Sequence, residues 1–167
     1  GSSWEEFCGD GDTPLEFMPV PFAHPLWILY SSGTTGLPKA IVHGHGGILV
    51  EHHKVLALHS DLGPGDRFFW FSTTGWMMWN YLVSGLLVGA TPVLFDGDPG
   101  DPGLDALWRM AADEGVTFLG TSAPFLLACR KAGVEPGAVA DLSALRAVGS
   151  TGAPLPAEGF EWVYEAV

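Results

Sequence analysis

Short apolar runs alternate with longer, helically periodic segments along most of this chain. The runs at 26–30, 39–43, 66–72, 91–95, 116–120 and 145–149 have the length and residue types of β-strands. The segments at 46–60, 76–88, 104–114, 123–132 and 156–166 are predicted to be helices. Strands that alternate with helices favour an α/β fold with a mostly parallel sheet and flanking helices.

The clearest helical period lies at 104–114. Leu104, Leu107, Trp108 and Ala111 form one apolar stripe, and Gly115 is placed to end the helix. This helix is therefore expected to pack on the sheet through that stripe.

Residues 1–25 are rich in Gly, Asp and Pro and show little periodicity, so they are expected to form an irregular lead-in. The ordered pattern starts at Leu26, and 26–167 are expected to form one partial domain. With 167 residues, 47% of them hydrophobic, the chain is long enough to bury a substantial core.

Segment 31–39 connects the first two predicted strands and reads Ser31-Ser32-Gly33-Thr34-Thr35-Gly36-Leu37-Pro38-Lys39. Its glycines let main-chain N–H groups converge on an anion, its hydroxyl groups add donors, and Lys39 adds a compact positive charge. This combination predicts a phosphate-binding loop. A Walker A loop would have Gly before the lysine and Ser or Thr after it, whereas Pro38 and Ala40 stand there.

A flexible Gly/Ser linker is the alternative interpretation of segment 31–39. The apolar runs at 26–30 and 41–42 on either side of it are predicted to be buried strands. Linkers are rarely bracketed in this way, so the phosphate-binding interpretation is favoured.

The net charge is −12, and the seven lysines and arginines are scattered along the sequence. A nucleic-acid groove is therefore not expected. An anionic nucleotide would need local neutralisation by the loop, by Lys39 and by a divalent cation such as Mg²⁺. Cys8 and Cys129 stand alone, without a Cys-x-x-Cys pair or the cysteine density of a disulfide scaffold, which suits a reducing compartment and predicts a cytoplasmic protein. The apolar stretch 81–95 is too short and too interrupted to cross a membrane.

Segment 31–39 resembles the nucleotide-phosphate loop of the adenylate-forming superfamily, which includes the acyl-CoA synthetases. It matches the pattern Ser/Thr-Ser-Gly-Thr-Thr-Gly-x-Pro-Lys at every position. The resemblance implies that ATP is a substrate and that Lys39 is a catalytic residue. It also implies that the ATP phosphates are bound by Ser31, Ser32, Gly33, Thr34, Thr35, Gly36 and Lys39.

Residues 26–96, with Gly-Trp-Met-Met-Trp-Asn at 75–80, look most like the acetoacetate-activating members of that superfamily. This resemblance implies an acid–CoA ligase that joins acetoacetate to coenzyme A through an acyl-adenylate. The residues expected to form the acyl pocket are Trp76, Met77, Met78 and Thr151. By composition alone, the aromatic and methionine side chains at 76–79 would be interpreted as core packing.

The turn at 149–155 follows a predicted strand and precedes a predicted helix, a common place for a ligand contact in α/β sheets. The resemblance places adenine near Gly152, Ala153 and Pro154. Acetyl-CoA synthetases commonly carry an acidic residue where Ala153 stands, which is a departure from the pattern. A plain strand-to-helix turn is the alternative interpretation.

Family members continue with a Thr-Glu pair that helps to hold the metal, a Thr-Gly-Asp motif that binds ribose, and a small C-terminal domain with a lysine. This sequence contains neither motif. The chain is therefore expected to be part of the large N-terminal domain, inactive alone, with the remainder of its own polypeptide as its partner.

Three other functions are considered. A ligase for another short acid, such as acetate or propionate, fits the same motifs, and so does a non-catalytic nucleotide-binding module. A Ser-His-Asp hydrolase would need Gly-x-Ser-x-Gly, which is absent.

The histidines at 43–59 raise the possibility of a metal site, but they lack Cys or carboxylate partners at ligand spacing. His43 and His45 are expected in structural roles, and His52 and His53 on a helix surface.

Overall fold

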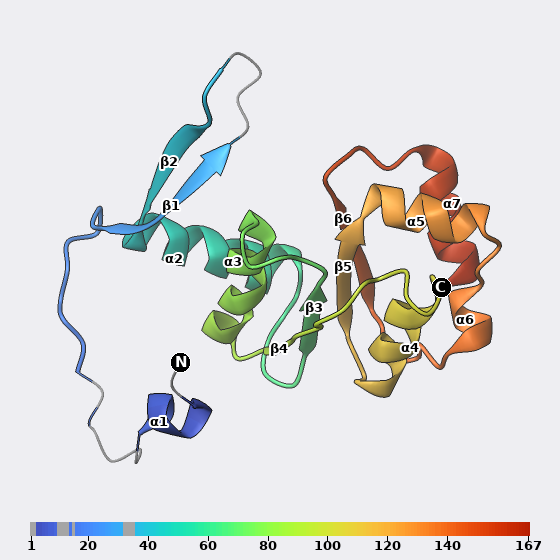
Figure 1. Cartoon of the computed structure of the whole chain (residues 1–167), viewed down its shortest axis with the longest axis horizontal. Helices are drawn as coiled ribbons and strands as arrows, with labels where there is room; N and C mark the ends of the chain where they lie inside the picture. The colour runs from blue at the N-terminus through green and yellow to red at the C-terminus, as the bar shows by residue number, and fades with distance from the viewer. Residues whose placement is uncertain (1–2, 10–13, 15, 32–35) are drawn as a thin grey trace. The chain divides into compact units, whose positions relative to one another are not determined.

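The computed structural model describes residues 3–9, 14, 16–31 and 36–167 (Figure 1). The chain divides into two compact units, residues 1–47 and 48–167. The boundary falls within helix α2 (His45–His53). The predicted division into a lead-in, 1–25, and one partial domain, 26–167, stays a prediction.

A short helix, α1 (Trp4–Cys8), lies within the predicted lead-in of the first unit. Ser3 Oγ accepts a hydrogen bond from the Glu6 backbone N–H (3.2 Å), and the Glu6 carboxylate accepts one from the Ser3 N–H (2.9 Å). This reciprocal pair is a capping box. The structure differs from the sequence prediction here because a Ser-x-x-Glu start can form one helical turn without a long apolar stripe.

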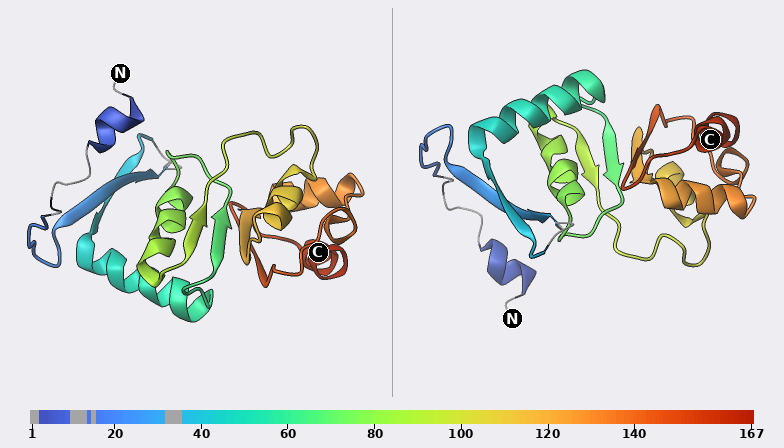
Figure 2. Two further views of the ribbon diagram at one scale, coloured as in Figure 1. Left: turned by 90° about the horizontal axis from the view of Figure 1, so that it is seen from below. Right: turned by 90° about the horizontal axis from the view of Figure 1, so that it is seen from above.

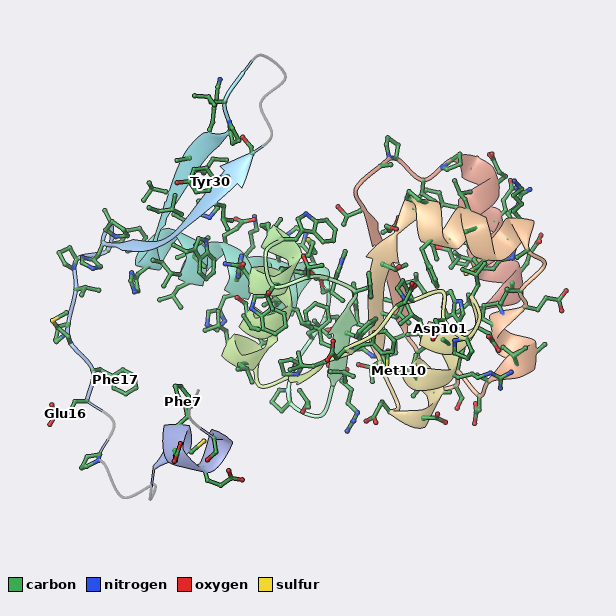
Figure 3. All side chains as sticks on the ribbon, in the orientation of Figure 1. Phe7, Glu16, Phe17, Tyr30, Asp101 and Met110 are labelled. Atoms are coloured by element: carbon green, nitrogen blue, oxygen red, sulfur yellow. The ribbon has the colours of Figure 1, made fainter. Side chains whose placement is uncertain are left out.

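Strands β1 (Pro25–Ser31) and β2 (Lys39–Gly44) form an antiparallel two-stranded sheet in the first unit. The prediction of two strands is confirmed, but the prediction that they are buried is wrong. Ile28 is 54% exposed and Tyr30 is 71% exposed, and Tyr30 is labelled on β1 in Figure 3. A two-stranded sheet has no second layer of its own to cover its faces, so an apolar run does not by itself guarantee burial.

The second unit contains a parallel sheet of four strands in the order β4-β3-β5-β6, which confirms the predicted α/β class. Its strands are β3 (Arg67–Trp70), β4 (Thr91–Val93), β5 (Phe118–Ser122) and β6 (Ala147–Thr151). Its helices after α2 are η1 (Lys54–His59), α3 (Met77–Val83), η2 (Ser84–Val88), α4 (Ala106–Asp113), α5 (Ala123–Lys131), α6 (Pro136–Val139) and α7 (Ala157–Ala166).

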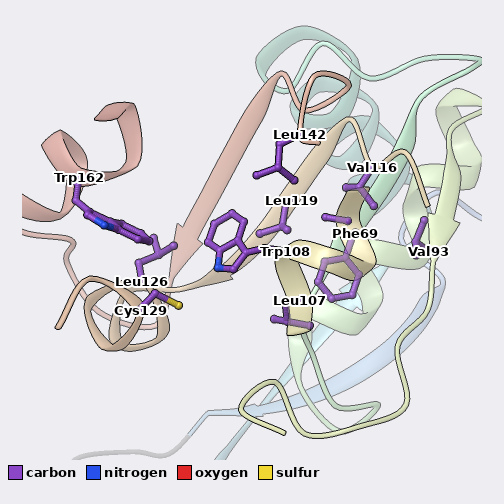
Figure 4. Packing of buried hydrophobic residues seen from close by; sticks show 11 residues of the cluster. Phe69, Val93, Leu107, Trp108, Val116, Leu119, Leu126, Cys129, Leu142 and Trp162 are labelled. Carbon is purple, nitrogen blue, oxygen red and sulfur yellow. The ribbon is translucent and has the colours of Figure 1, made fainter. Parts of the chain in front are cut away.

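Each face of this sheet is covered by its own set of helices, as the views in Figure 2 show. Neighbouring residues of β3 point to opposite faces, as in any strand. Phe69 belongs to the same buried cluster as Trp108 of α4 and Trp162 of α7, drawn in Figure 4. Phe68 and Trp70 pack in a second cluster, which includes side chains of η1 and α3. The stripe predicted on 104–114 is confirmed, since Leu107, Trp108 and Ala111 are buried.

Two predicted helices change their hydrogen-bond pattern partway along. The segment 46–60 continues from α2 into the π-helix η1, and 76–88 continues from α3 into the 3₁₀-helix η2. Ser84 Oγ donates to the carbonyl of Asn80 (2.7 Å) at the second change. Such changes depend on tertiary packing, which the apolar period alone does not encode. Helix α6 was not predicted, because it is a single turn with Pro136 at its start.

A polar network centred on Asp66 joins the amino ends of the four parallel strands. The carboxylate of Asp66 accepts hydrogen bonds from Arg146 Nη2 (2.6 Å), Thr117 Oγ1 (2.8 Å) and the Gly63 N–H (2.9 Å). The Asp66 carbonyl accepts from the Thr91 N–H (2.8 Å). Asp66, Thr117 and Arg146 each directly precede a strand, and Thr91 begins one.

The same network sets the charge state of Asp66. Burial acts to raise the pKa of Asp66, but the hydrogen bonds from Arg146, Gly63 and Thr117 outweigh it and leave the pKa below its ordinary value. Asp66 therefore stabilises the fold in its charged form.

No helix in the described part of the chain is both long enough and apolar enough to cross a membrane.

Candidate functional site

Segment 31–39 is the connection between β1 and β2, and its two end residues, Ser31 and Lys39, pair with each other in the register of the hairpin. Gly36 has φ of +150°, a conformation that L side chains rarely adopt, so the backbone requires a glycine there. Lys39 is exposed. The predicted phosphate-binding residues Ser32, Gly33, Thr34 and Thr35 lie outside the described residues.

A cavity of about 460 Å³ in the second unit brings together Met77, Met78 and Thr151, three of the residues predicted for the acyl pocket. The carboxyl ends of β3 and β6 contribute to it, and this is the edge of an open α/β sheet where ligands bind. Its lining residues are Glu51, His52, Val55, Ser60, Trp70, Met77, Met78, Tyr81, Phe118, Gly149, Ser150 and Thr151. Trp76, the N-cap residue of α3, is not among them, and its role stays a prediction.

A second cavity, of about 520 Å³, lies beside β6 and α7. Its lining is mainly apolar and contains none of the residues predicted for the phosphate, adenine or acyl sites. The smaller cavity is therefore the candidate site.

The indole of Trp70 forms part of the wall of this site because two glycines leave room for it. A Cβ atom at Gly120 would lie 2.1 Å from Trp70 Cδ2, and one at Gly149 would lie 2.8 Å from Trp70 Cη2. Trp70 is 7% exposed and its ring stacks on Phe118 with centroids 6.2 Å apart. Any side chain at either glycine would displace the indole.

Four residues with a hydroxyl group lie in the same lining, Ser60, Tyr81, Ser150 and Thr151. Ser60 Oγ and Tyr81 Oη are 3.1 Å apart, and either can donate to the other. Burial raises the pKa of Tyr81, and the hydrogen bond from Ser60 offsets this only in part. The phenol is therefore neutral at physiological pH and keeps its hydrogen.

His52 also lines the cavity, and the prediction that it lies on a helix surface is wrong. It is 8% exposed, and its Nδ1 lies 2.6 Å from Ser84 Oγ. Because that hydroxyl already donates to Asn80, His52 is the donor in this hydrogen bond. The amphipathic pattern of 46–60 is weak, so it did not indicate which histidine faces inward. His53 is exposed, as predicted.

His43 and His45 have structural contacts in the first unit, as predicted. Trp27 Nε1 donates to His43 Nδ1 (2.9 Å), and His45 Nδ1 lies 3.0 Å from the carbonyl of His24. Among the described residues, no group of three or more His, Cys, Asp and Glu side chains lies close enough to hold a metal ion.

The predicted adenine-binding residues Gly152, Ala153 and Pro154 form an exposed turn directly after β6. Gly152 has φ of +88°, which favours glycine and turns the chain away from the strand. The turn is therefore at the same edge of the sheet as the cavity. The assignment to adenine stays a prediction.

Sequence reasoning missed most of the polar lining of the cavity. Tyr81 stands four residues after Met77 and so lies on the same face of α3, a spacing that could have indicated it. Ser60 and His52 come from a segment with no clear period, so the sequence carries no comparable signal for them.

The chain is similar to a protein family and to several known proteins. The AMP-binding enzyme family matches residues 5–167. The structure of the acetoacetyl-CoA synthetase from Streptomyces lividans is similar with a TM-score of 0.90 and 61% identity, over 96% of this chain and 25% of that one. The acetoacetyl-coenzyme A synthetase of Rhizobium meliloti is 53% identical, over 92% of this chain and 24% of its own length.

A third relative, the malonamoyl-CoA synthetase vrtB of Penicillium aethiopicum, is 43% identical over 91% of this chain and 23% of its own length. The chain thus spans about a quarter of the length of the relatives it matches. Because the family match extends over nearly all of the sequence, the chain belongs to the AMP-binding enzyme family.

Proposed function

We propose that this chain is part of an ATP-dependent acid–CoA ligase whose acid is acetoacetate. One observation supports the proposal most: similarity to acetoacetyl-CoA synthetases extends over 92% of the chain in one relative and 96% in another. The acyl groups in the names of the three relatives, acetoacetyl and malonamoyl, both have a carbonyl group on carbon 3. An acid with that group is therefore the proposed substrate.

The proposed reaction has two steps. A carboxylate oxygen of the acid attacks the α-phosphorus of ATP, the bond to pyrophosphate breaks, and an acyl-adenylate forms. The thiol of coenzyme A then loses its proton and attacks the acyl carbon, and AMP leaves. The first step needs orientation of ATP and neutralisation of the departing pyrophosphate. Backbone N–H groups and hydroxyls of segment 31–39, with the ammonium group of Lys39, are proposed to supply both.

The cavity is proposed to hold the acyl group. Met77 and Met78 give it an adaptable apolar wall, while Trp70 and Phe118 give it a rigid one. Bulky side chains on both sides favour a short acid. Thr151 would stand beside the acyl group, and Gly152, Ala153 and Pro154 beside adenine.

Magnesium enters this proposal only as the ion that accompanies the ATP substrate. The described residues offer no carboxylate or histidine cluster for it, so no step is assigned to a protein-bound metal. Both cysteines, Cys8 and Cys129, are free thiols, which supports the proposal of a reducing compartment, the cytoplasm.

The test is acid-dependent exchange of pyrophosphate into ATP by the complete ligase that contains this chain. Acetate, propionate, butyrate and acetoacetate are compared at equal concentration. We expect the highest kcat/KM with acetoacetate, and formation of acetoacetyl-CoA when coenzyme A is added. Equal rates with acetate and acetoacetate would contradict the proposed acid.

A further inference from the structure

Four residues of the cavity lining carry a hydroxyl group, Ser60, Tyr81, Ser150 and Thr151, and the proposed reaction gives no role to Ser60 and Tyr81. The surface of this cavity is mainly apolar, and Met77 and Met78 contribute to it. In ligand pockets of this kind, a few polar groups set the orientation of the ligand and discriminate between similar molecules.

The Ser60–Tyr81 hydroxyl pair can donate a hydrogen bond to a ligand. Each hydroxyl has one hydrogen and can both donate and accept. Their mutual hydrogen bond of 3.1 Å uses one hydrogen and leaves the other. The described residues provide no other hydrogen bond to either hydroxyl group, so the pair has one O–H donor to offer to an acceptor in the cavity.

Neighbouring rings hold the phenol of Tyr81 in place. Phe68, Trp70 and His52 meet it edge to face, with ring centroids 5.5, 5.6 and 5.9 Å away. The contact of His52 with Ser84 fixes that ring in turn. Because its neighbours already hold this side chain in place, it loses little conformational entropy when it binds a ligand. Such a donor can distinguish a ligand with an acceptor at the right position from one without it.

The charge of the lining favours a neutral acceptor. Glu51 lines the cavity, and its carboxylate is paired with Lys54 (2.7 Å) at the surface. Among the described residues, the lining contains no Lys or Arg, so a second carboxylate on the ligand would have no cationic partner there, whereas a ketone or amide carbonyl needs none.

We propose that the Ser60–Tyr81 hydroxyl pair selects acids with a carbonyl oxygen on carbon 3, by donating a hydrogen bond to that oxygen. This inference rests on the proposed function and adds the residues that determine its specificity. An acid with a methylene group at carbon 3 would leave the donor unpaired in a partly buried site, which lowers its transition-state binding.

The test compares acetoacetate with butyrate, which has the same carbon chain without the carbonyl. The complete ligase is prepared as wild type, Tyr81→Phe, Ser60→Ala and Tyr164→Phe. The last is the matched control, because Tyr164 is 89% exposed and does not line this cavity. The readout is kcat/KM for acid-dependent pyrophosphate exchange with each acid.

We expect Tyr81→Phe to reduce the preference for acetoacetate over butyrate about tenfold, and Ser60→Ala to reduce it in the same direction. The rate with butyrate should stay within about twofold of wild type, which also shows that the variants fold. Tyr164→Phe should keep the wild-type preference.

Two results would overturn the inference, and they are distinguishable. If wild type prefers acetoacetate and both variants keep that preference, or lose activity equally with both acids, the hydroxyl pair does not select the carbonyl. If wild type shows no exchange with acetoacetate, the proposed function itself fails, and the inference fails with it.

Discussion

Lys39 is the first residue of β2 and the last residue of segment 31–39, so a rigid strand supports the proposed phosphate-binding cation. The pairing of Ser31 with Lys39 brings the two ends of the segment together. In a chain with net charge −12, this lysine is the one cationic residue in the sequence of segment 31–39. Its removal should therefore affect the step in which pyrophosphate leaves.

In the complete ligase, we expect Lys39→Ala to slow adenylate formation by about 100-fold. Thiol transfer from preformed acyl-adenylate should change much less, because pyrophosphate has already left before that step. Single-turnover kinetics of each half-reaction measure this. Lys131→Ala, at the exposed end of α5, is the control. Comparable losses in both half-reactions would argue against the proposed role of Lys39.

Gly149 shows how a residue without a side chain shapes the candidate site. A Cβ there would come within 2.8 Å of Trp70 and 2.9 Å of Phe118, the two stacked rings of the cavity. We expect Gly149→Ala to destabilise the fold by about 1–3 kcal/mol and to raise KM for the acid. Urea unfolding and exchange kinetics measure the two effects.

The matched control is Gly47→Ala, since a Cβ at Gly47 has no atom within 4 Å. This variant should retain both stability and KM. A Gly149→Ala protein with wild-type stability and KM would show that the indole can move without cost, and the description of the wall would be wrong.

Among the secondary-structure elements, the amino ends of the four parallel strands are joined by hydrogen bonds to Asp66. Because the pKa of Asp66 is lowered in the folded state, its contribution to stability is present above the ordinary aspartate value of about 4 and is lost as pH falls through the lowered pKa. We expect Asp66→Asn to reduce the unfolding free energy by about 1–2 kcal/mol at neutral pH. The difference from wild type should shrink at acidic pH.

Urea unfolding of the 167-residue chain, followed over a pH series, measures this difference. Asp113→Asn serves as the control because Asp113 is exposed on α4. The difference in unfolding free energy between wild type and Asp66→Asn could instead stay constant down to the lowest pH. That result would show that the charge of Asp66 does not stabilise the amino ends of the strands.

At this scale, much of the fold could be predicted from sequence. The period at 104–114 and the alternation from 66 to 166 identify the parallel sheet, because helices and strands of that length have distinct apolar spacings. The antiparallel pairing of β1 with β2 and the change from α2 to η1 could not be predicted, since pairing direction and helix type depend on contacts between distant residues. For the same reason, the position of Tyr81 opposite Ser60 could not be predicted. Met77 and Met78 line the same cavity, and their assignment to the acyl group stays a prediction.

For the whole molecule, the two compact units contain different parts of the proposed machinery. Segment 31–39 belongs to residues 1–47, and the cavity belongs to residues 48–167. The resemblance to complete ligases implies ribose-binding and metal-binding motifs and a catalytic lysine that this sequence does not contain.

We therefore expect the 167-residue chain alone to give no acid-dependent exchange of pyrophosphate into ATP. The complete ligase, assayed in parallel, is the positive control. Exchange above background that requires both the chain and the acid would contradict this expectation and would show that the missing motifs are dispensable.

The Asp66 network and the candidate cavity contact opposite ends of β3 and β6. Side chains proposed to contact the acid can therefore be substituted without disturbing the ion pair between Asp66 and Arg146. We expect substitutions around Met77 and Met78 to change the acid preference of the proposed ligase while the amino ends of the strands stay intact.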